Sequence, residues 1–318
     1  MNTSTETPEA HAKSVPQLTE VSIVLVCWNN KDYLDPCLQS LYGGNVNHSF
    51  DVVAVDNGST DGSQAMLQEK YPQILIIQND KNVGLSKASN QGIEATKGKY
   101  VLLLNNDTLI NRMTIDPLVD FLDDHPEAGA VGGRLFNPDG SFQGGYADFS
   151  TLLEEFLIAT HIGELIWPGY PSHGNTDQVK PGGWLSSACL LVRREALNQV
   201  GFLDEEYFIY GDEADLQYRL KKGGWKVYYL PSSTIIHYGG RSMNRWRRRK
   251  MVYRGKMLFY KKNYGIFKTG LLRVMLFVLS LLKLIIWAVI SIIPQKREAA
   301  KREVNSNSEV IKLCFNLE

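Results

Sequence analysis

The chain has 318 residues, of which 44% are hydrophobic, so it can bury the core of one large domain or two modest ones. Its formal net charge of zero conceals a split: residues 1–215 hold 30 acidic and 12 basic side chains, whereas residues 216–297 hold 19 basic side chains and no acidic one. A basic half indicates an anionic partner, and the long apolar stretch within it favours lipid and excludes nucleic acid.

The N-terminal segment and the cysteines are typical of an intracellular protein. Residues 1–20 are polar, with Lys13 as their only lysine or arginine, which excludes a secretory signal peptide and predicts a disordered leader. The four cysteines, at positions 27, 37, 189 and 314, lack the spacing of a metal site and resemble reduced thiols.

The first hundred residues alternate between apolar runs and helical patterns. Apolar runs at 21–27, 51–55, 73–78 and 101–104 predict strands, and the spacing of apolar residues over 31–41, 63–70 and 82–97 predicts helices. This alternation predicts βαβ units with a mostly parallel sheet, which is a Rossmann-like α/β nucleotide-binding fold. The glycine-rich GxGxxG and P-loop patterns are absent, which leaves a metal to neutralise bound phosphates.

The next hundred and forty residues are less regular. Their patterns predict strands at 130–134, 184–193, 226–230 and 234–237, and helices at 114–124, near 152–162 and at 194–200. A further helix begins in the acidic run 211–215 and ends before Gly223.

Polar residues follow the strand at 101–104. Asn105 and Asp107 have the same side-chain parity on an extended backbone, so both can face one ligand in the crevice beyond the carboxyl ends of the strands. One carboxylate with neighbouring amide oxygens suits a hard divalent cation that is shared with substrate phosphates. The alternative is a strand-to-turn junction, where Asn and Asp are also favoured.

Asp212, Glu213 and Asp215 place three carboxylates within four positions. Such carboxylates repel one another unless a cation, a proton or a substrate relieves the repulsion. The crowding raises the pKa of one member, which makes a usable general base. The alternative is a helix N-terminus, where each carboxylate is favoured by about 0.3–1 kcal/mol.

Six segments follow one another along the chain: VSIVLVCWN, VVAVDNGSTDGS, NVGLSKASNQGI, VLLLNNDT, RREALNQVGFLDEEYFIYGDEADLQYRLKKGGWKVYYLP and IIHYGGRS. In this order they resemble the family 2 glycosyltransferases of the inverting GT-A fold. The resemblance is closest to the bacterial rhamnosyltransferase-like branch that builds cell-surface polysaccharides. It implies a GT-A domain over 21–242, with a nucleotide-sugar-binding half at 21–108 and an acceptor-binding half at 109–242.

The resemblance implies which residues hold the nucleotide-sugar. Asp56 matches the acid that contacts the nucleotide base. Cys27 and Asn29 match the loop that lines the base and the ribose, with Cys27 in place of the more usual Thr or Ser. Lys87 and Asn90 lie in the segment that reaches the diphosphate.

The resemblance also implies a Mg²⁺ or Mn²⁺ ion at the diphosphate. Asp107 matches the last acid of the DxD-type signature and is assigned to the metal. The first acid of that signature is Asn105 here, and Asn105 and Asn106 are assigned to the donor. His237 matches a histidine that approaches the diphosphate or the metal, with a structural role at the end of its strand as the alternative.

The catalytic base of the family falls on Glu213. The family usually has Glu-Asp at this point and the chain has Asp212-Glu213, so Asp212 is a rival for the role. The resemblance implies an inverting glycosyltransferase that moves a sugar, rhamnose by analogy with the branch, from a nucleotide-diphosphate sugar to a glycan or lipid-linked saccharide. The alternatives are an inactive nucleotide-sugar-binding protein and a nucleotidyltransferase, which normally has a glycine-rich loop that the chain lacks after its first strand.

The acceptor side is implied by fewer residues. Trp184 matches an aromatic acceptor position, with a core tryptophan as the alternative, and Asp215 is assigned to the same side. The usual Gly-Ala after this tryptophan is replaced by residues 186–188, SSA, which leaves the acceptor open. We predict that residues 167–170, WPGY, form a packed turn, with a loop that faces the acceptor as the alternative.

Residues 243–297 are predicted to associate with a membrane, and residues 298–318 to form a polar tail. Ten basic residues within 241–262 precede an apolar stretch at 270–293, whose 24 residues are long enough to span a bilayer. Lys283 near its middle would cost about 2.5–3.5 kcal/mol there, so a helix lying in the interface is the alternative. We expect the catalytic body at the cytoplasmic face of the bacterial inner membrane, where nucleotide-sugars are made.

Overall fold

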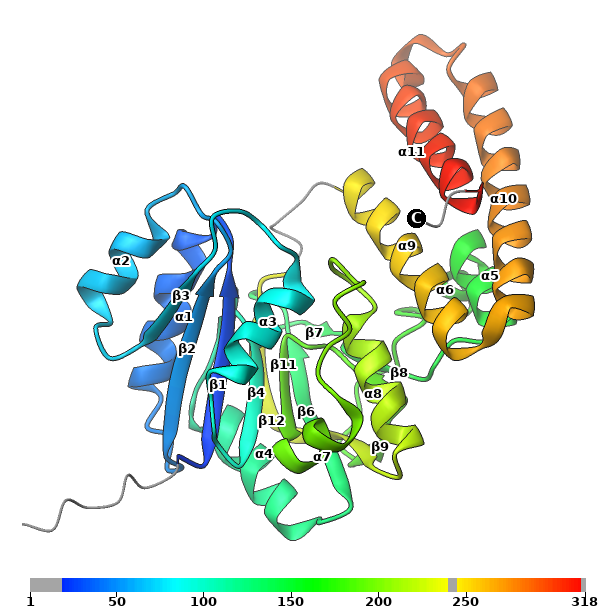
Figure 1. Cartoon of the computed structure of the whole chain (residues 1–318). Helices are drawn as coiled ribbons and strands as arrows, with labels where there is room; N and C mark the ends of the chain where they lie inside the picture. The colour runs from blue at the N-terminus through cyan, green and yellow to red at the C-terminus, as the bar shows by residue number, and fades with distance from the viewer. Residues whose placement is uncertain (1–18, 240–244, 316–318) are drawn as a thin grey trace, which may run out of the picture.

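The computed structural model describes residues 19–239 and 245–315, so most of the predicted leader and the segment 240–244 lie outside the described residues. Its centre is a ten-stranded sheet (Figure 1). Eight of its strands have the order β3-β2-β1-β4-β11-β6-β12-β5, and the short strands β7 and β9 pair with β6 and β12. The four parallel strands of its first half are β1 (Val21–Cys27), β2 (Phe50–Asp56), β3 (Leu75–Gln78) and β4 (Tyr100–Asn105). The predicted α/β fold with a mostly parallel sheet is confirmed.

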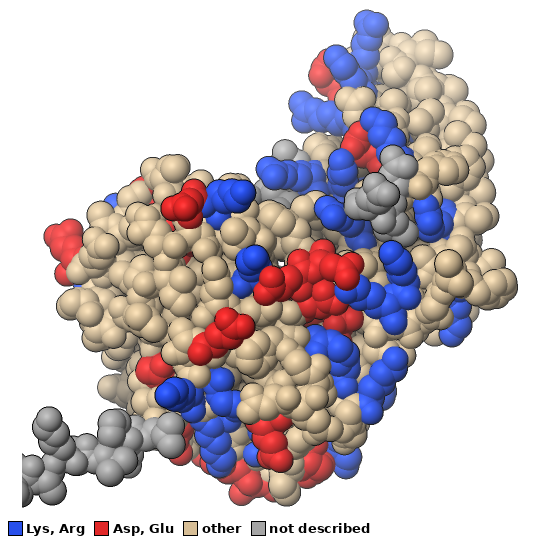
Figure 2. All heavy atoms as spheres, in the orientation of Figure 1, with Lys and Arg blue, Asp and Glu red and all other residues tan. Residues whose placement is uncertain are grey.

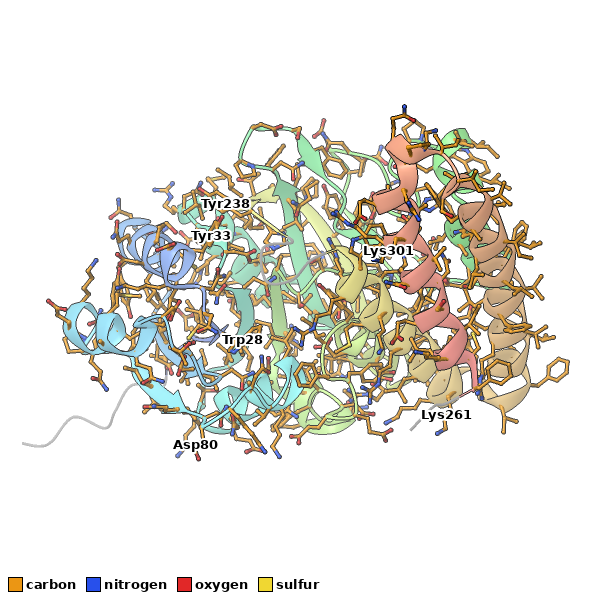
Figure 3. All side chains as sticks on the ribbon, turned by 90° about the horizontal axis from the view of Figure 1, so that it is seen from above. Trp28, Tyr33, Asp80, Tyr238, Lys261 and Lys301 are labelled. Atoms are coloured by element: carbon orange, nitrogen blue, oxygen red, sulfur yellow. The ribbon has the colours of Figure 1, made fainter. Side chains whose placement is uncertain are left out.

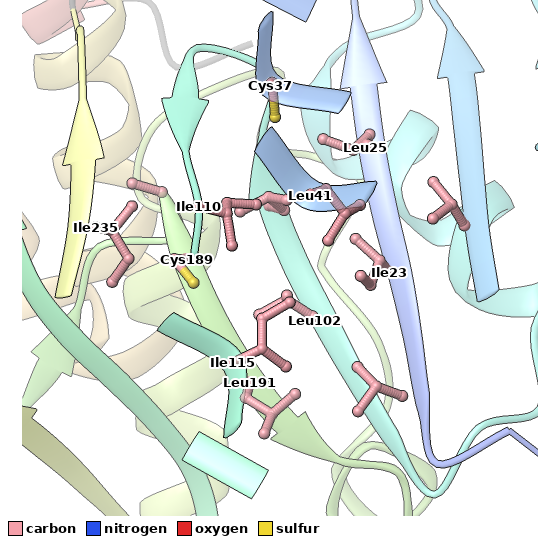
Figure 4. Packing of buried hydrophobic residues seen from close by; sticks show 14 of the residues in the cluster. Ile23, Leu25, Cys37, Leu41, Leu102, Ile110, Ile115, Cys189, Leu191 and Ile235 are labelled. Atoms are coloured by element: carbon pink, nitrogen blue, oxygen red, sulfur yellow. The ribbon is translucent and has the colours of Figure 1, made fainter. Parts of the chain in front are cut away.

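Helices cover both faces of this half, as the apolar runs require. Alternate residues of a strand point to opposite faces, so Ile23 and Leu25 pack with α1 and α2 while Val24 packs in the core on the α3 side. Figure 4 shows the first of these cores, with Leu41 of α1 beside the strands. Burial on both faces explains why the strands read as uninterrupted apolar runs. The helices are α1 (Lys31–Gly43), α2 (Ser63–Lys70) and α3 (Leu85–Glu94).

The second half makes the sheet mixed. β11 (Cys189–Arg193) runs antiparallel to its neighbours β4 and β6 (Ala128–Phe136), and β12 (Lys226–His237) runs parallel to β6. β5 (Thr108–Leu109) closes this edge antiparallel to β12. The other elements of this half are α4 (Arg112–Asp124), β7 (Phe142–Gln143), α5 (Leu152–Thr160), α6 (Ile162–Ile166), β9 (Lys180–Pro181), α7 (Arg194–Val200) and α8 (Asp212–Lys222).

Two strand predictions differ from the structure. The single strand predicted over 184–193 is two strands, because β10 (Trp184–Leu185) leaves the main sheet to pair with β8 (Tyr146–Ala147). The Leu185 backbone N–H donates to Oε1 of Gln217, 2.8 Å away, which holds β10 against α8. The two strands predicted at 226–230 and 234–237 are one strand, β12, whose register against β6 shifts around Pro231, a residue that has no N–H to donate.

Three helices follow the sheet: α9 (Arg245–Asn263), α10 (Gly265–Ile290) and α11 (Arg297–Phe315), with the short 3-10 turn η1 (Pro294–Lys296) before the last. Within the described residues, α10 is the one helix long and apolar enough to cross a membrane. α11 returns along α10, and both pack against α9 (Figure 1), so the segment that we assign to a polar tail is part of this C-terminal helical module. In Figure 2, Lys and Arg side chains gather on this module, whereas acidic side chains gather on the body of the protein.

Candidate functional site

The carboxyl ends of β1, β2 and β4 meet at one edge of the sheet because the three strands are parallel. Figure 3 looks down onto this edge and shows Trp28 on the loop after β1. Tyr33 of α1 and Tyr238 after β12 lie across the edge with their ring centroids 5.1 Å apart. The loops at this edge hold the residues assigned to the donor.

Asp56 ends β2 with a buried carboxylate. It accepts hydrogen bonds from the Ser59 backbone N–H, 3.2 Å away, and from the side chain of Gln64. Cys27 lies behind it, fully buried, with its Sγ 3.6 Å from Oδ1 of Asp56. Burial and the charge of Asp56 raise the pKa of the Cys27 thiol. The resemblance assigns Cys27 to the lining of the base and ribose, but its buried thiol contacts Asp56 and is not open to a ligand.

Asn29 shapes the same loop. Its Oδ1 accepts from the Thr60 backbone N–H, 2.7 Å away, and its own backbone has a positive φ of 49°, which asparagine tolerates better than most residues. Gly58 is held even more tightly, because a Cβ there would lie 2.7 Å from the Cα of Lys81. The loop after β2 is thus fixed to the loops after β1 and β3.

The two α3 residues assigned to the donor differ in exposure. Lys87 is half exposed, and its Nζ lies 3.8 Å from Oε2 of Glu205. Asn90 is buried, donates from Nδ2 to the Leu203 carbonyl at 2.8 Å and accepts from the Leu203 N–H at 3.0 Å. Asn90 therefore positions the segment before α8, while Lys87 faces solvent.

Asn105, Asp107 and His237 meet where β4 and β12 end. The Nε2 atom of His237 is 3.3 Å from Oδ1 of Asp107 and 3.4 Å from Nδ2 of Asn105. Asn106 points elsewhere, since its Nδ2 donates to the Val26 carbonyl at 3.0 Å and its Oδ1 accepts from Nδ2 of Asn30 at 2.6 Å. The structure thus brings three of the four residues together and uses Asn106 to tie β1 to β4.

Gln143 of β7 fixes the tautomer of His237, and the sequence had given no sign of it. Its Nε2 donates to Oδ1 of Asn137 at 2.7 Å and to the His237 carbonyl at 3.1 Å, which leaves Oε1 to accept from Nδ1 of His237 at 2.7 Å. With its proton on Nδ1, the ring presents the lone pair of Nε2 beside Asp107. No local pattern could reveal this contact, because 94 residues separate the two side chains.

The side chains of Asp107 and His237 suit a divalent metal whose remaining ligands come from a substrate and water. The described residues contain no group of three or more His, Cys, Asp or Glu side chains that could hold a metal by themselves. Asp107 offers one carboxylate and His237 one imidazole nitrogen. Mg²⁺ in phosphate-transfer sites commonly takes one or two protein carboxylates and completes its coordination with phosphate oxygens and water.

Asp212 and Glu213 begin α8 in different environments. Asp212 is buried, and its Oδ1 has no hydrogen-bond partner among the described residues. Burial, followed by the charge of Glu213, raises the pKa of Asp212 well above its usual value. Glu213 is only partly buried and accepts from the Gly211 backbone N–H at 3.2 Å. Asp212 lines a small cavity of about 20 Å³ together with Asn105 and Ser187, which brings this one member of the acidic cluster close to Asn105.

Both carboxylate oxygens of Asp215 accept hydrogen bonds from other side chains of the protein. Its Oδ2 accepts from Nε of Arg219 at 2.8 Å, and its Oδ1 accepts from Nδ2 of Asn263 at 2.8 Å. The guanidinium of Arg219 also donates to three carbonyls of the segment 200–202. The resemblance assigns Asp215 to the acceptor side, but both of its oxygens bind protein groups, and the bond to Asn263 joins α8 to the end of α9.

The half predicted to bind the acceptor, residues 109–242, contains a pocket of about 380 Å³, within the range of small-molecule sites. Trp167 and Tyr170 line it, so the WPGY segment is a pocket wall as well as a turn. Asp148 and His173, 3.2 Å apart, line another side. Trp184 is partly buried in β10, which pairs with Ala147, the residue before Asp148.

α9 packs directly on the segment that leads into the acidic cluster. A Cβ on Gly255 would lie 2.2 Å from the carbonyl oxygen of Tyr210, so only glycine fits there. Tyr210 has a positive φ of 66°, and the guanidinium of Arg248 lies 5.8 Å from the centre of its ring. The C-terminal module therefore fixes the backbone immediately before Asp212.

Comparison with solved structures places this arrangement among GT-A folds. The chain superposes on the mannosyltransferase PcManGT from Pyrobaculum calidifontis, solved with GDP-Man and Mn²⁺, with a TM-score of 0.56 and 14% identity over 94% of this chain and 88% of that one. It superposes on GalNAc-T7, solved with UDP, GalNAc and Mn²⁺, with a TM-score of 0.55 and 16% identity over 95% of this chain and 56% of that one. At these identities the likeness shows the fold alone.

Sequence comparison identifies the family. The chain is 32% identical over 240 residues to the N-acetylglucosaminyl-diphospho-decaprenol L-rhamnosyltransferase of Mycobacterium tuberculosis, which covers 70% of this chain and 77% of the relative. It is 28% identical over 229 residues to the O-antigen biosynthesis protein RfbC of Myxococcus xanthus, which covers 69% of this chain and 17% of that protein. The family described as "Glycosyl transferase family 2" matches residues 22–201, more than half of the chain. The chain therefore belongs to glycosyl transferase family 2 and is a glycosyltransferase.

Proposed function

We propose that this glycosyltransferase transfers a sugar, with inversion, from a nucleotide-diphosphate sugar to a saccharide acceptor in the synthesis of a cell-surface polysaccharide. One observation supports this most strongly. Asn105 contacts His237, which faces Asp107, and the same Asn105 lines a small cavity with Asp212, whose Oδ1 has no hydrogen-bond partner among the described residues. Two residues that suit a metal, Asp107 and His237, thus lie near two residues that suit acid-base chemistry, Asp212 and Glu213.

The donor lies across this edge with its nucleotide base beside Asp56. Asn29 and Cys27 hold the loop that carries Asp56, and Lys87 reaches the negative charge of the donor from α3. Asp107 and His237 would hold Mg²⁺ or Mn²⁺, which acts as a Lewis acid on the leaving diphosphate when it is bound. The solved neighbours with Mn²⁺ and a nucleotide or nucleotide-sugar support the choice of ion.

Glu213 accepts the proton of the acceptor hydroxyl. The raised pKa of Asp212 favours its neutral form, and Glu213 is the less buried member of the pair, so we assign the proton-accepting role to Glu213. As the proton moves to Glu213, the acceptor oxygen forms a bond with the anomeric carbon, and the bond from that carbon to the diphosphate oxygen breaks on the opposite face. The nucleoside diphosphate leaves with the electron pair, and the configuration is inverted.

The acceptor is a lipid-linked saccharide and the donor sugar is rhamnose. The support is the 32% identical relative, whose name specifies a rhamnosyltransferase with a lipid diphosphate acceptor. The pocket beside Trp167 and Tyr170 offers aromatic faces and polar groups of the kind that bind sugars, and it adjoins β10 with Trp184. An acceptor of this kind places the enzyme at an anionic membrane surface, on the cytoplasmic face of the bacterial inner membrane.

Donor turnover by the detergent-solubilised protein tests the proposal. A panel of UDP-, GDP- and dTDP-sugars, with and without Mn²⁺ or Mg²⁺, should reveal metal-dependent release of one nucleoside diphosphate, with dTDP-rhamnose as the expected donor. Binding without turnover, in the presence of lipid-linked acceptors, would favour the alternative of an inactive nucleotide-sugar-binding protein. No binding of any donor would contradict the assignment.

Glu213→Gln tests the base. The substitution keeps the size of the side chain and removes its proton-accepting charge, so we expect unchanged donor affinity and a loss of turnover of about 10²–10⁴-fold. Asp212→Asn is the matched comparison, because the neutral form of Asp212 is already favoured, and it should lose much less. Equal losses in the two variants would mean that Asp212 and Glu213 are both needed to remove the proton. Wild-type turnover in Glu213→Gln would refute the assignment of the base.

A further inference from the structure

Four polar side chains along α10 face the protein, whereas Lys268, near the beginning of the helix, is exposed. Nε of Arg273 donates to the Cys314 carbonyl at 2.6 Å, and Nζ of Lys283 donates to the Ala159 carbonyl at 2.5 Å. Thr269 and Ser280 are buried on the same side. Arg273 and Lys283, which would be costly inside a bilayer, therefore have their partners on α11 and α5.

The opposite face of α10 is apolar and exposed along its whole length. Ile266 is 88% exposed at one end and Val289 is 62% exposed at the other, which gives a stripe about 35 Å long. Its members recur at helical spacing and include Phe267, Leu271, Val274, Val278 and Ile285. A patch of this length on a soluble surface marks an interaction site.

α5 and α6 extend this surface towards the acceptor pocket. α5 packs against α10, and the two lie side by side in Figures 1 and 3. Leu165 of α6 is 84% exposed, and Trp167, the residue after α6, lines the pocket of the acceptor half. The apolar surface therefore leads to the pocket wall.

The charge of the C-terminal module indicates which kind of partner binds the exposed face of α10. Residues 245–315 hold 17 Lys and Arg against 3 Glu, a net charge of +14. Two of the three acids are paired, Glu303 with Arg249 and Glu309 with Lys250. A second copy of the chain would bring two strongly positive surfaces together, whereas an anionic bilayer complements the charge.

The packing of α9 and α11 decides the orientation. Both helices lie against α10, and their ion pairs join Arg249 to Glu303 at 2.7 Å and Lys250 to Glu309 at 2.6 Å. If α10 spanned the bilayer in this arrangement, these charged helices would enter the hydrocarbon with it. We propose that α10 lies in the plane of an anionic bilayer, with its outer face in the interface and the α5–α6 edge beside it, so that the acceptor pocket opens next to the lipid surface.

This inference deepens the proposed function, because a lipid-linked acceptor would keep its lipid in the bilayer while its sugar enters the pocket beside Trp167. It rests on the proposed function only for the choice of acceptor. Its test uses phosphatidylcholine vesicles with and without phosphatidylglycerol, and donor turnover in detergent is measured separately.

The full-length protein should co-sediment with the anionic vesicles, and the triple variant Val274→Asp/Val278→Asp/Ile285→Asp should bind at least tenfold more weakly with unchanged donor turnover. The control variant Leu75→Asp/Met113→Asp/Val179→Asp adds the same charge to exposed apolar positions of the body and should bind normally. Equal binding by the two triple variants would overturn the proposal. So would a dimer in detergent that the α10 variant alone dissociates, since a second copy would then cover this face.

Labelling distinguishes an in-plane helix from a spanning one. Lys268→Cys and Lys296→Cys place a thiol at each end of α10, and the four natural cysteines are buried. In sealed inverted inner-membrane vesicles, an impermeant maleimide should label both variants without detergent. Protection of one end until detergent is added would show a spanning helix and overturn the proposal, whether or not the enzyme turns over its donor.

Discussion

Individual hydrogen bonds decide which side chains at the sheet edge are free for a ligand. The amides of Asn90 and Asn106 are used within the protein, as are both oxygens of Asp215. Nε2 of His237 lies beside Asp107, and Gln143 holds His237 in the tautomer that leaves the lone pair of Nε2 available to a ligand. The residue type alone does not distinguish these two groups.

Gln143→Ala should weaken metal binding while the fold is retained. Without Oε1 to fix the ring, His237 can turn or move its proton to Nε2, and loss of such a supporting contact typically costs about 10–100-fold in metal affinity. The measurement is the Mn²⁺ concentration at half-maximal donor turnover, together with Mn²⁺ binding followed by its paramagnetic resonance. Gln199→Ala, whose amide contacts the Gly223 carbonyl, is the matched control. An unchanged Mn²⁺ requirement in Gln143→Ala would argue against His237 as a ligand.

Asp212→Asn should stabilise the protein increasingly as the pH rises. The folded-state pKa of Asp212 is raised, so the native protein holds a proton that the unfolded chain releases, and wild-type stability falls as the pH rises from about 4 through the folded-state pKa. The amide variant has no such loss. We expect the difference in unfolding free energy to grow by at most about 1.4 kcal/mol per pH unit.

Urea unfolding of both proteins between pH 5 and pH 8 measures this difference. Asp80→Asn, at an exposed position on the periphery in Figure 3, should show no such trend. A difference that stays constant with pH would mean that Asp212 is ionised in the native state.

At the scale of elements, α9 is a helix of the C-terminal module that joins it to the rest of the protein. Gly255 contacts the Tyr210 carbonyl, Asn263 binds Asp215, and Lys256 forms an ion pair with the buried Glu155 at 2.6 Å. These contacts join α9 to α8, to α5 and to the segment before Asp212. The module is therefore part of the support of the site and not an appended anchor.

Gly255→Ala should lower both stability and turnover. Alanine normally favours a helix over glycine by about 1 kcal/mol, but here its Cβ would displace the Tyr210 carbonyl. Overpacking of this kind typically costs about 1–3 kcal/mol. Gly270→Ala in α10, where a Cβ meets nothing within 4 Å, should be neutral or stabilising. Equal behaviour of the two variants in thermal unfolding and donor turnover would contradict the role of α9.

At the scale of the whole molecule, acidic and basic side chains are separated in space. The body is acidic, the C-terminal module is basic, and the exposed face of α10 lies on the module (Figure 2). Such a distribution is the one that the proposed binding to an anionic membrane requires.

Binding to anionic vesicles should weaken by about tenfold or more between 0.1 M and 1 M salt, because the screening length falls from about 10 Å to about 3 Å. The outer face of α10 should retain part of the binding at high salt, since burial of apolar surface is not screened. Co-sedimentation at several salt concentrations measures this. Binding that does not change with salt would mean that the basic module does not contact the lipid.

Local patterns predicted most of the fold correctly. The strands at 21–27 and 101–104, the helix at 63–70 and the helix that begins in the acidic cluster lie where the apolar spacing and the capping residues indicated. These elements are specified by residues close in sequence, so periodicity suffices. The predicted continuous strand over 184–193 failed because Gln217, on a distant helix, holds its first two residues out of the main sheet.

The sequence by itself determined the family, the order of the elements and the residue types at the sheet edge, because motifs and periodicity are local properties of a chain. Only the tertiary structure decided that Gln143 orients His237, that Asp215 anchors α9, that the Asp212 oxygen lacks a partner, and that the polar side of α10 faces α5 and α11. Each of these depends on contacts between segments far apart in the chain, and a hydrogen bond or a buried charge is fixed by its surroundings in space rather than by its neighbours in sequence.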